Sequence, residues 1–175
     1  MRLYKYIKSA QFVESTLEFL KLQNIDIAIS KPKIISNQLK KHSSWISRIK
    51  KETEISARFE FSIMHSHKGN ILPHTDDPNK IITMVISMNR NSEWNTKWGG
   101  GTQICEPKEE RKIFNQKNTY LKFNDVRVLK EFPFHQNQCI LFIKTYNSWH
   151  QVSPLRGPIE GPFRKTLTIN IEVIK

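Results

Sequence analysis

The 175-residue sequence has no long apolar run free of charge, and it contains only two cysteines, Cys105 and Cys139. The first absence excludes a membrane-spanning helix, which needs about 20 consecutive apolar residues. The second excludes a dense disulfide framework. Lysines at positions 5 and 8 stand where a secretory signal peptide would have its apolar stretch. We therefore expect a cytoplasmic protein in a reducing compartment.

Internal repeats and low-complexity segments are also missing, so the sequence does not indicate a solenoid or a disordered tail. A composition of 38% hydrophobic and 25% charged residues is typical of a folded globular chain. A chain of this length buries roughly 70% of its unfolded surface, enough for a core without disulfides or structural metal. We expect a single domain over residues 1–175, with helical support in 1–56 and a β-rich core in 57–175.

Acidic residues are few relative to basic ones: 16 Asp and Glu face 28 Lys and Arg, which gives a net charge of +12. This excess either favours an anionic partner or reflects a composition rich in lysine, isoleucine and asparagine. A sheet that binds nucleic acid would interleave aromatic with basic residues, and residues 164–174 contain no aromatic side chain. The sequence favours a small-molecule or peptidyl substrate, with anionic character left open, over nucleic acid. It predicts no membrane partner.

Two kinds of hydrophobic pattern divide the chain. Residues 9–23 follow helical spacing with Ser9 as a plausible N-cap, and residues 34–52 indicate a second helix with lysines opposite its apolar side. From residue 57 on, short β-branched and aromatic runs alternate with Gly, Pro and Asn clusters, which is typical of an antiparallel sandwich, jelly roll or barrel. The predicted strands are 58–64, 81–88, 102–106, 119–123, 125–129, 138–145 and 164–174.

Three polar side chains are candidate metal ligands. His74 and Asp76 are two residues apart, so in extended backbone both point to one face. His150 follows the predicted strand 138–145. Two histidines and one carboxylate on one face of an iron ion leave three positions open. Taken singly, the first pair also fits a polar turn, and His150 also fits a packing role beside Trp149.

The last predicted strand has one polar face. Alternation places Arg164 and Thr166 on this face and Lys165 on the opposite one. A polar face headed by arginine suits a lined cavity better than a plain core. Arginine can hold a carboxylate through two parallel hydrogen bonds, and a threonine hydroxyl can donate one more.

Together these parts resemble the iron(II)- and 2-oxoglutarate-dependent oxygenase superfamily, and within it the prolyl-hydroxylase-like branch. The resemblance implies a mainly β fold, a double-stranded β-helix (a cupin-like jelly roll) with the N-terminal helices packed outside. The motifs that carry it lie between about residues 59 and 173, in the segments 69–76, 80–89, 98–100, 147–152 and 164–166.

Roles for single residues follow from the same resemblance. It implies that His74, Asp76 and His150 bind Fe(II), and that Arg164, assisted by Thr166, pairs with the distal carboxylate of the cosubstrate 2-oxoglutarate. It implies no catalytic residue beyond the metal centre. The activity implied is that of a dioxygenase, most often a hydroxylase, that consumes O2 and 2-oxoglutarate and releases succinate and CO2. Desaturation and epimerisation are the alternative oxidative outcomes.

The sequence departs from the family pattern at one position and is ambiguous at two others. Many relatives have a tyrosine shortly before the first motif as a second cosubstrate contact; here His65 or Ser66 stands in that stretch. Lys165 is the alternative to Arg164, and Asp77 is the alternative to Asp76.

A different functional class also deserves a test: a non-catalytic jelly-roll module that binds an anionic ligand. Such a module would be expected to lack a metal ligand or the basic residue, and the sequence keeps both. We expect the N-terminal helices and the loops 90–98 and 107–118 to shape substrate specificity.

Overall fold

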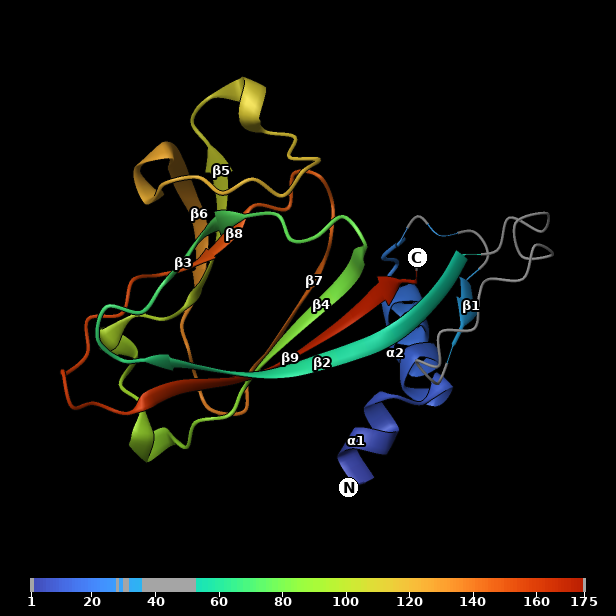
Figure 1. Cartoon of the computed structure of the whole chain (residues 1–175), viewed down its shortest axis with the longest axis horizontal. Coiled ribbons are helices and arrows are strands. Elements are labelled where there is room, and N and C mark those ends of the chain that lie inside the picture. The colour runs from blue at the N-terminus through green and yellow to red at the C-terminus, as the bar shows by residue number, and fades with distance from the viewer. Residues whose placement is uncertain (1, 28, 30–31, 36–52, 175) are drawn as a thin grey trace.

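Two β-sheets make up most of the protein in the computed structural model, which describes residues 2–27, 29, 32–35 and 53–174 (Figure 1). The larger sheet has the strand order β1-β2-β9-β4-β7, and the smaller has the order β3-β8-β5-β6. The strands are β1 (Pro32–Ile34), β2 (Thr53–His65), β3 (Ile71–His74), β4 (Lys80–Ser87), β5 (Thr102–Pro107), β6 (Val126–Phe132), β7 (Cys139–Ile143), β8 (His150–Val152) and β9 (Phe163–Val173).

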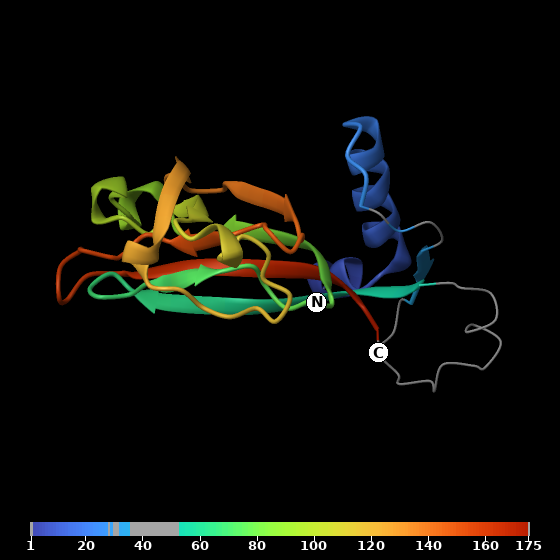
Figure 2. The same cartoon turned by 90° about the horizontal axis from the view of Figure 1, so that it is seen from above.

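The long antiparallel ladder between β2 and β9 organises the larger sheet. It runs from the pair Ile55 and Val173 to the pair His65 and Phe163, and β4 pairs with the other edge of β9. Figure 2 shows the smaller sheet lying over one face of this ladder. Because side chains alternate along a strand, β9 presents one polar face toward the smaller sheet and one apolar face away from it.

Two helices pack on the apolar face. α1 (Arg2–Ile7) and α2 (Ala10–Leu22) lie near the start of β2 and the end of β9 (Figure 1). The Ser9 hydroxyl caps α2 by accepting a hydrogen bond from the amide of Phe12. The buried residues of this core are Ile7, Val13, Leu20, Ile55, Ala57, Ile81, Ile82, Met84, Leu167, Ile169 and Ile171. No described helix is long and apolar enough to cross a membrane.

The mainly β architecture with helices outside confirms the predicted fold class. The helix predicted at 9–23 and six of the seven predicted strands are confirmed, with ends that differ by a few residues. Two short strands that bear on the site, β3 and β8, had not been predicted. They contain only four and three residues, too few for alternation to stand out in the sequence.

Two expectations about local structure fail. The helix expected from residue 34 does not begin there, because Ile34 pairs in parallel with Ile55 as part of β1; residues 36–52 lie outside the described chain. The strand expected at 119–123 is a loop. The Asn115 side chain binds both the amide and the carbonyl of Thr119, which closes a turn, and a short 3-10 helix follows at Phe123–Asp125.

Candidate metal centre

Strands β3 and β8 bring the two candidate histidines together. His74 ends β3, His150 begins β8, and the two residues are direct partners in the antiparallel ladder. Directly opposed residues project to the same face of a sheet. Their imidazole rings accordingly lie with centroids 4.4 Å apart, although 75 residues of sequence separate them. Both side chains are largely buried.

Asp76 joins the histidines through a turn rather than through strand alternation. We expected extended backbone to place His74 and Asp76 on one face. The two side chains do meet, but not for that reason, because β3 ends at His74. Asp76 has a φ of 70°, in the left-handed region that aspartate tolerates better than most residues. This turn directs the carboxylate back toward the histidines. Such backbone conformations are often found at functional sites.

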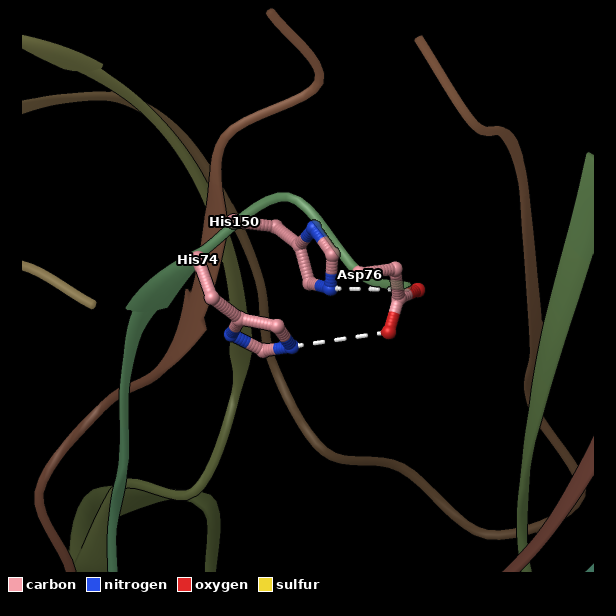
Figure 3. A group of neighbouring side chains, drawn as sticks. All are labelled: His74, Asp76 and His150. Carbon is pink, nitrogen blue, oxygen red and sulfur yellow. Dashed lines mark ion pairs between the residues drawn. The ribbon is translucent and has the colours of Figure 1, made fainter. Parts of the chain in front are cut away.

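The three side chains converge on one point (Figure 3). His74 Nε2 lies 3.6 Å from Asp76 Oδ1, and His150 Nε2 lies 3.8 Å from Asp76 Oδ2. One donor atom from each residue lies within 4.8 Å of the other two, and this is the one such group of histidine, cysteine and acidic residues in the described part of the chain. Two imidazole nitrogens and a carboxylate oxygen could therefore hold a metal ion with further coordination positions open.

Backbone carbonyls orient both imidazoles in the same way. The Nδ1 atom of His74 lies 2.9 Å from the carbonyl oxygen of Leu72, and the Nδ1 atom of His150 lies 2.9 Å from that of Ser148. A carbonyl oxygen only accepts, so each Nδ1 carries the proton and donates it. In a neutral ring the Nε2 lone pair then faces Asp76. A histidine that binds a metal through Nε2 needs this tautomer. Burial, aided by the neighbouring His74, lowers the pKa of His150 to about 4, so it is neutral at pH 7.

Asp76 is held as a carboxylate by polar neighbours. Lys80 Nζ lies 2.6 Å from Oδ1, and the Thr83 hydroxyl lies 3.0 Å from Oδ2. Burial raises the pKa of Asp76, but the interactions with His74 and His150 in their protonated forms and with Lys80 outweigh it and hold this pKa well below its usual range. Two carboxylate oxygens offer about four lone-pair positions. The bonds from Lys80 and Thr83 thus leave acceptor capacity on each oxygen for a metal.

A buried hydrogen-bond chain lies behind Asp76. Thr83 Oγ1 is 3.0 Å from Asp76 Oδ2 and 3.1 Å from the side-chain oxygen of Asn170, but its single proton cannot be donated to both. The carboxylate is the stronger acceptor. The Nδ2 atom of Asn170 has no partner, so turning this amide lets Nδ2 donate to the threonine oxygen. The chain then runs from Asn170 through Thr83 to Asp76 and fixes the carboxylate.

Removing the Thr83 hydroxyl should weaken metal binding without changing a ligand. Valine keeps the branched shape of threonine but cannot donate to Asp76. We expect Thr83→Val to lower Fe(II) affinity about tenfold, at the lower end of the range for groups that orient metal ligands. Thr83→Ser keeps the hydroxyl and is the matched control. Anaerobic Fe(II) titration of both variants measures the effect, and equal affinities would show that Thr83 does not position Asp76.

Arg164 lies on the polar face of β9, buried among backbone and aromatic groups. Its Nε donates to the carbonyl oxygen of Gly100 at 2.8 Å, and its guanidinium carbon lies 4.4 Å from the centre of the Phe134 ring. Burial lowers the pKa of Arg164 to about 10, so the group stays charged at pH 7. Within the described residues no carboxylate pairs with it. A buried cation without a counter-charge is costly, which makes this position a candidate anion site.

Glycine is required where the chain passes Arg164. Gly100 has a φ of 79°, and a Cβ atom there would approach Leu155 Cδ2 to 2.6 Å and Arg164 Cδ to 3.2 Å. A side chain would therefore be strained in its backbone and would also displace the arginine. The Gly-Gly motif at 99–100 thus has a local role, because it lets the backbone carbonyl of Gly100 reach the guanidinium.

The structure shows different surroundings for the residues that the sequence left as alternatives in the site. Lys165 points to the other face of β9, where its Nζ binds Glu93 at 3.1 Å. Asp77 is exposed, and its carboxylate accepts the amide of Asn79 in a turn. Ser66 is fully buried with its hydroxyl donating to the carbonyl of Pro158, and the His65 Nδ1 accepts the amide of His67. Thr166 is buried two residues beyond Arg164 on the same strand.

Sequence reasoning missed several residues around the centre. Lys80 and Thr83 contact Asp76, and Tyr120 stacks on His74 with ring centroids 5.2 Å apart. The spacing from Asp76 to Lys80 is four residues, but in a loop this spacing carries no contact signal. Tyr120 comes from a distant loop, held in place where Thr75 bonds to Asn115 and Asn118. No local pattern could have indicated these contacts.

Two comparisons with known proteins found similarities. The family model of the 2OG-Fe(II) oxygenase superfamily matches residues 59–172. Among solved structures, the chain is similar to one described under "Crystal structure and expression patterns of prolyl 4-hydroxylases from Phytophthora capsici", at 17% identity and a TM-score of 0.38. That similarity covers 69% of this chain and 33% of the other, so the chain spans about a third of that protein.

A search among curated proteins found no match. The family model nevertheless covers well over half of the chain, including both histidines, the aspartate and the arginine described above. The chain therefore belongs to the 2OG-Fe(II) oxygenase superfamily, whose cofactor is Fe(II) and whose cosubstrates are 2-oxoglutarate and O2.

Proposed function

We propose that the protein is an Fe(II)- and 2-oxoglutarate-dependent dioxygenase that hydroxylates a C–H bond of an amino acid, a peptidyl residue or a small metabolite. In this proposal His74, Asp76 and His150 bind the iron. Arg164 and Thr166 bind the distal carboxylate of 2-oxoglutarate. The observation that carries it is the convergence of the two Nε2 atoms on an ionised, buried carboxylate.

The donor set fits iron(II) better than a structural metal. Two imidazoles and one carboxylate supply three ligands and leave the remaining positions for exogenous groups, whereas structural zinc is closed by four protein ligands. Among the described residues no fourth histidine, cysteine or acid joins the group. Hydrogen bonds orient all three candidate ligands: the carbonyls of Leu72 and Ser148 hold the imidazoles, and Lys80 and Thr83 hold the carboxylate.

In the overall reaction one oxygen atom of O2 enters the succinate and the other enters the new hydroxyl group, while C1 of 2-oxoglutarate leaves as CO2. Iron, when bound, supplies the activation of O2 that this chemistry needs. The residues of the chain do the positioning. Arg164 holds the cosubstrate at its distal end, and the carbonyls of Leu72 and Ser148 keep the imidazole nitrogens aimed at the metal.

The residues around His74 support the view that the substrate approaches from the side of the loop that carries Tyr120. Tyr120 stacks on the His74 ring and is 58% exposed, so one of its faces is available to a substrate. Lys144 lies close enough to Asp76 and Asp77 for their charges to raise its pKa, although burial lowers it overall. Its ammonium group would attract an anionic substrate. The 107–118 loop comes just before Tyr120 and is bonded to Thr75 next to the site, which supports its predicted role in specificity.

An anaerobic titration tests the proposal directly. Adding Fe(II) and then 2-oxoglutarate should produce a weak visible charge-transfer band, because the band requires both groups in one complete site. With O2 admitted, the protein should release succinate, and a screen of free amino acids, peptides and nucleotide-linked sugars should identify compounds that accelerate this release. Binding of 2-oxoglutarate with neither a band nor succinate would instead indicate the non-catalytic binding module.

A further inference from the structure

The indole nitrogen of Trp94 is a buried hydrogen-bond donor without an acceptor. Its Nε1 atom is fully shielded by the described residues, and none of them accepts its proton. Leaving such a donor unpaired lowers stability, so native proteins rarely keep one without a reason. The proposed function above gives Trp94 no role, and no other part of the fold explains the unpaired nitrogen.

The indole of Trp94 and the side chain of Arg164 flank the same glycine. A Cβ atom on Gly100 would lie 3.3 Å from Trp94 Cζ2 and 3.2 Å from Arg164 Cδ, so these two atoms flank the same glycine. Cζ2 and Nε1 are both bonded to Cε2 and share one edge of the ring. The unpaired nitrogen is therefore two bonds away from the ring carbon that flanks Gly100 together with the arginine.

Aromatic packing holds this arrangement in place. Trp94 contacts Phe134 edge to face at 5.4 Å between centroids, and the guanidinium of Arg164 lies over the same Phe134 ring at 4.4 Å. Trp98 packs against Trp94 at 5.5 Å between centroids. An indole and a guanidinium thus both contact the Phe134 ring, and no carboxylate of the described chain is paired with either.

We propose that Trp94 is a further cosubstrate-binding residue, whose Nε1–H donates to the 2-oxoglutarate carboxylate held by Arg164. This inference rests on the proposed function of the Arg164 site. A guanidinium fork occupies two of about four acceptor positions on a carboxylate, so a third donor can bind the same group. His65 and Ser66, the alternatives considered from the sequence, use their polar atoms elsewhere.

The test compares two variants and two ligands. Trp94→Phe keeps an aromatic ring against Phe134 but removes the donor; Trp98→Phe is the matched control, because it changes the neighbouring ring in the same way. The ligands are 2-oxoglutarate and 2-oxopentanoate, which has a methyl group in place of the distal carboxylate. Affinities are measured by anaerobic calorimetry on Mn(II)-loaded protein, so no turnover is required.

We expect Trp94→Phe to weaken 2-oxoglutarate binding about 10- to 100-fold, the range for a hydrogen bond to a charged group, and to change 2-oxopentanoate binding less than about twofold. Trp98→Phe should leave both affinities nearly unchanged. An unaltered 2-oxoglutarate affinity in Trp94→Phe overturns the inference. An equal loss for both ligands also overturns it, because Trp94 would then act through packing.

A second measurement does not depend on the stability of the variant. In Zn(II)-loaded wild-type protein, the indole proton of Trp94 should shift downfield in the NMR spectrum when 2-oxoglutarate is added, and less when 2-oxopentanoate is added. Equal shifts contradict the inference. If the wild-type protein binds no 2-oxoglutarate, the proposed function itself fails; if binding depends on Arg164 but not on Trp94, only this inference fails.

Discussion

The Asp76→Asn variant is expected to lose turnover and nearly all Fe(II) binding. Asparagine has the same shape and also tolerates the left-handed backbone of this position, so the substitution removes the charge without straining the turn. Groups that only orient a ligand lower metal affinity about 10- to 100-fold when they are replaced. Loss of the only anionic ligand should exceed that range. Anaerobic Fe(II) titration and succinate release measure both effects.

Asp77→Asn is the matched control for this substitution. Asp77 follows directly in the chain, but it is exposed and its carboxylate only accepts a backbone amide in the turn. We expect its Fe(II) affinity to stay near the wild-type value. Circular dichroism should show both variants folded, because neither residue belongs to the helix-packed core. Wild-type affinity in Asp76→Asn would refute the ligand assignment.

The candidate ligands could be predicted from the sequence because their chemistry is carried by single residues at recognisable spacing. His74, Asp76 and His150 occur in order, and Arg164 follows on a strand whose alternation is regular over many residues. Alternation correctly placed Arg164 and Lys165 on opposite faces, as their different partners show. Alternation is a reliable guide in a long strand such as β9, because the regular pleat determines the face to which each side chain points.

The rest of the site depends on contacts between distant segments. The backbone conformation of Asp76, and not extended pairing, directs its carboxylate to the histidines. Thr83 and Asn170 sit on neighbouring strands and meet only through the β4–β9 register. Trp94 lies in a loop with short 3-10 turns and flanks Gly100 together with Arg164. Such contacts arise from tertiary packing, which leaves no period in the sequence to detect.

Arg164→Ala should raise the 2-oxoglutarate requirement sharply while leaving Fe(II) binding close to that of the wild type. The guanidinium is buried beside Phe134 and has no acidic partner within the described residues. Removing one partner of a buried, hydrogen-bonded charge pair costs roughly 2–5 kcal/mol. At about 1.4 kcal/mol per tenfold change, this is a loss of about 30- to several-thousand-fold in 2-oxoglutarate affinity.

Two further substitutions separate the charge of Arg164 from its shape and position. Arg164→Lys should recover only part of the lost affinity, because an ammonium makes a point contact where the guanidinium makes two parallel hydrogen bonds. Lys165→Ala should change 2-oxoglutarate affinity little, since its side chain leaves the opposite face of β9 and binds Glu93. Anaerobic titration with 2-oxoglutarate ranks the three variants by their affinity for this cosubstrate. If Lys165→Ala shows the large loss and Arg164→Ala does not, Lys165 is the cosubstrate anchor and the buried guanidinium serves another purpose.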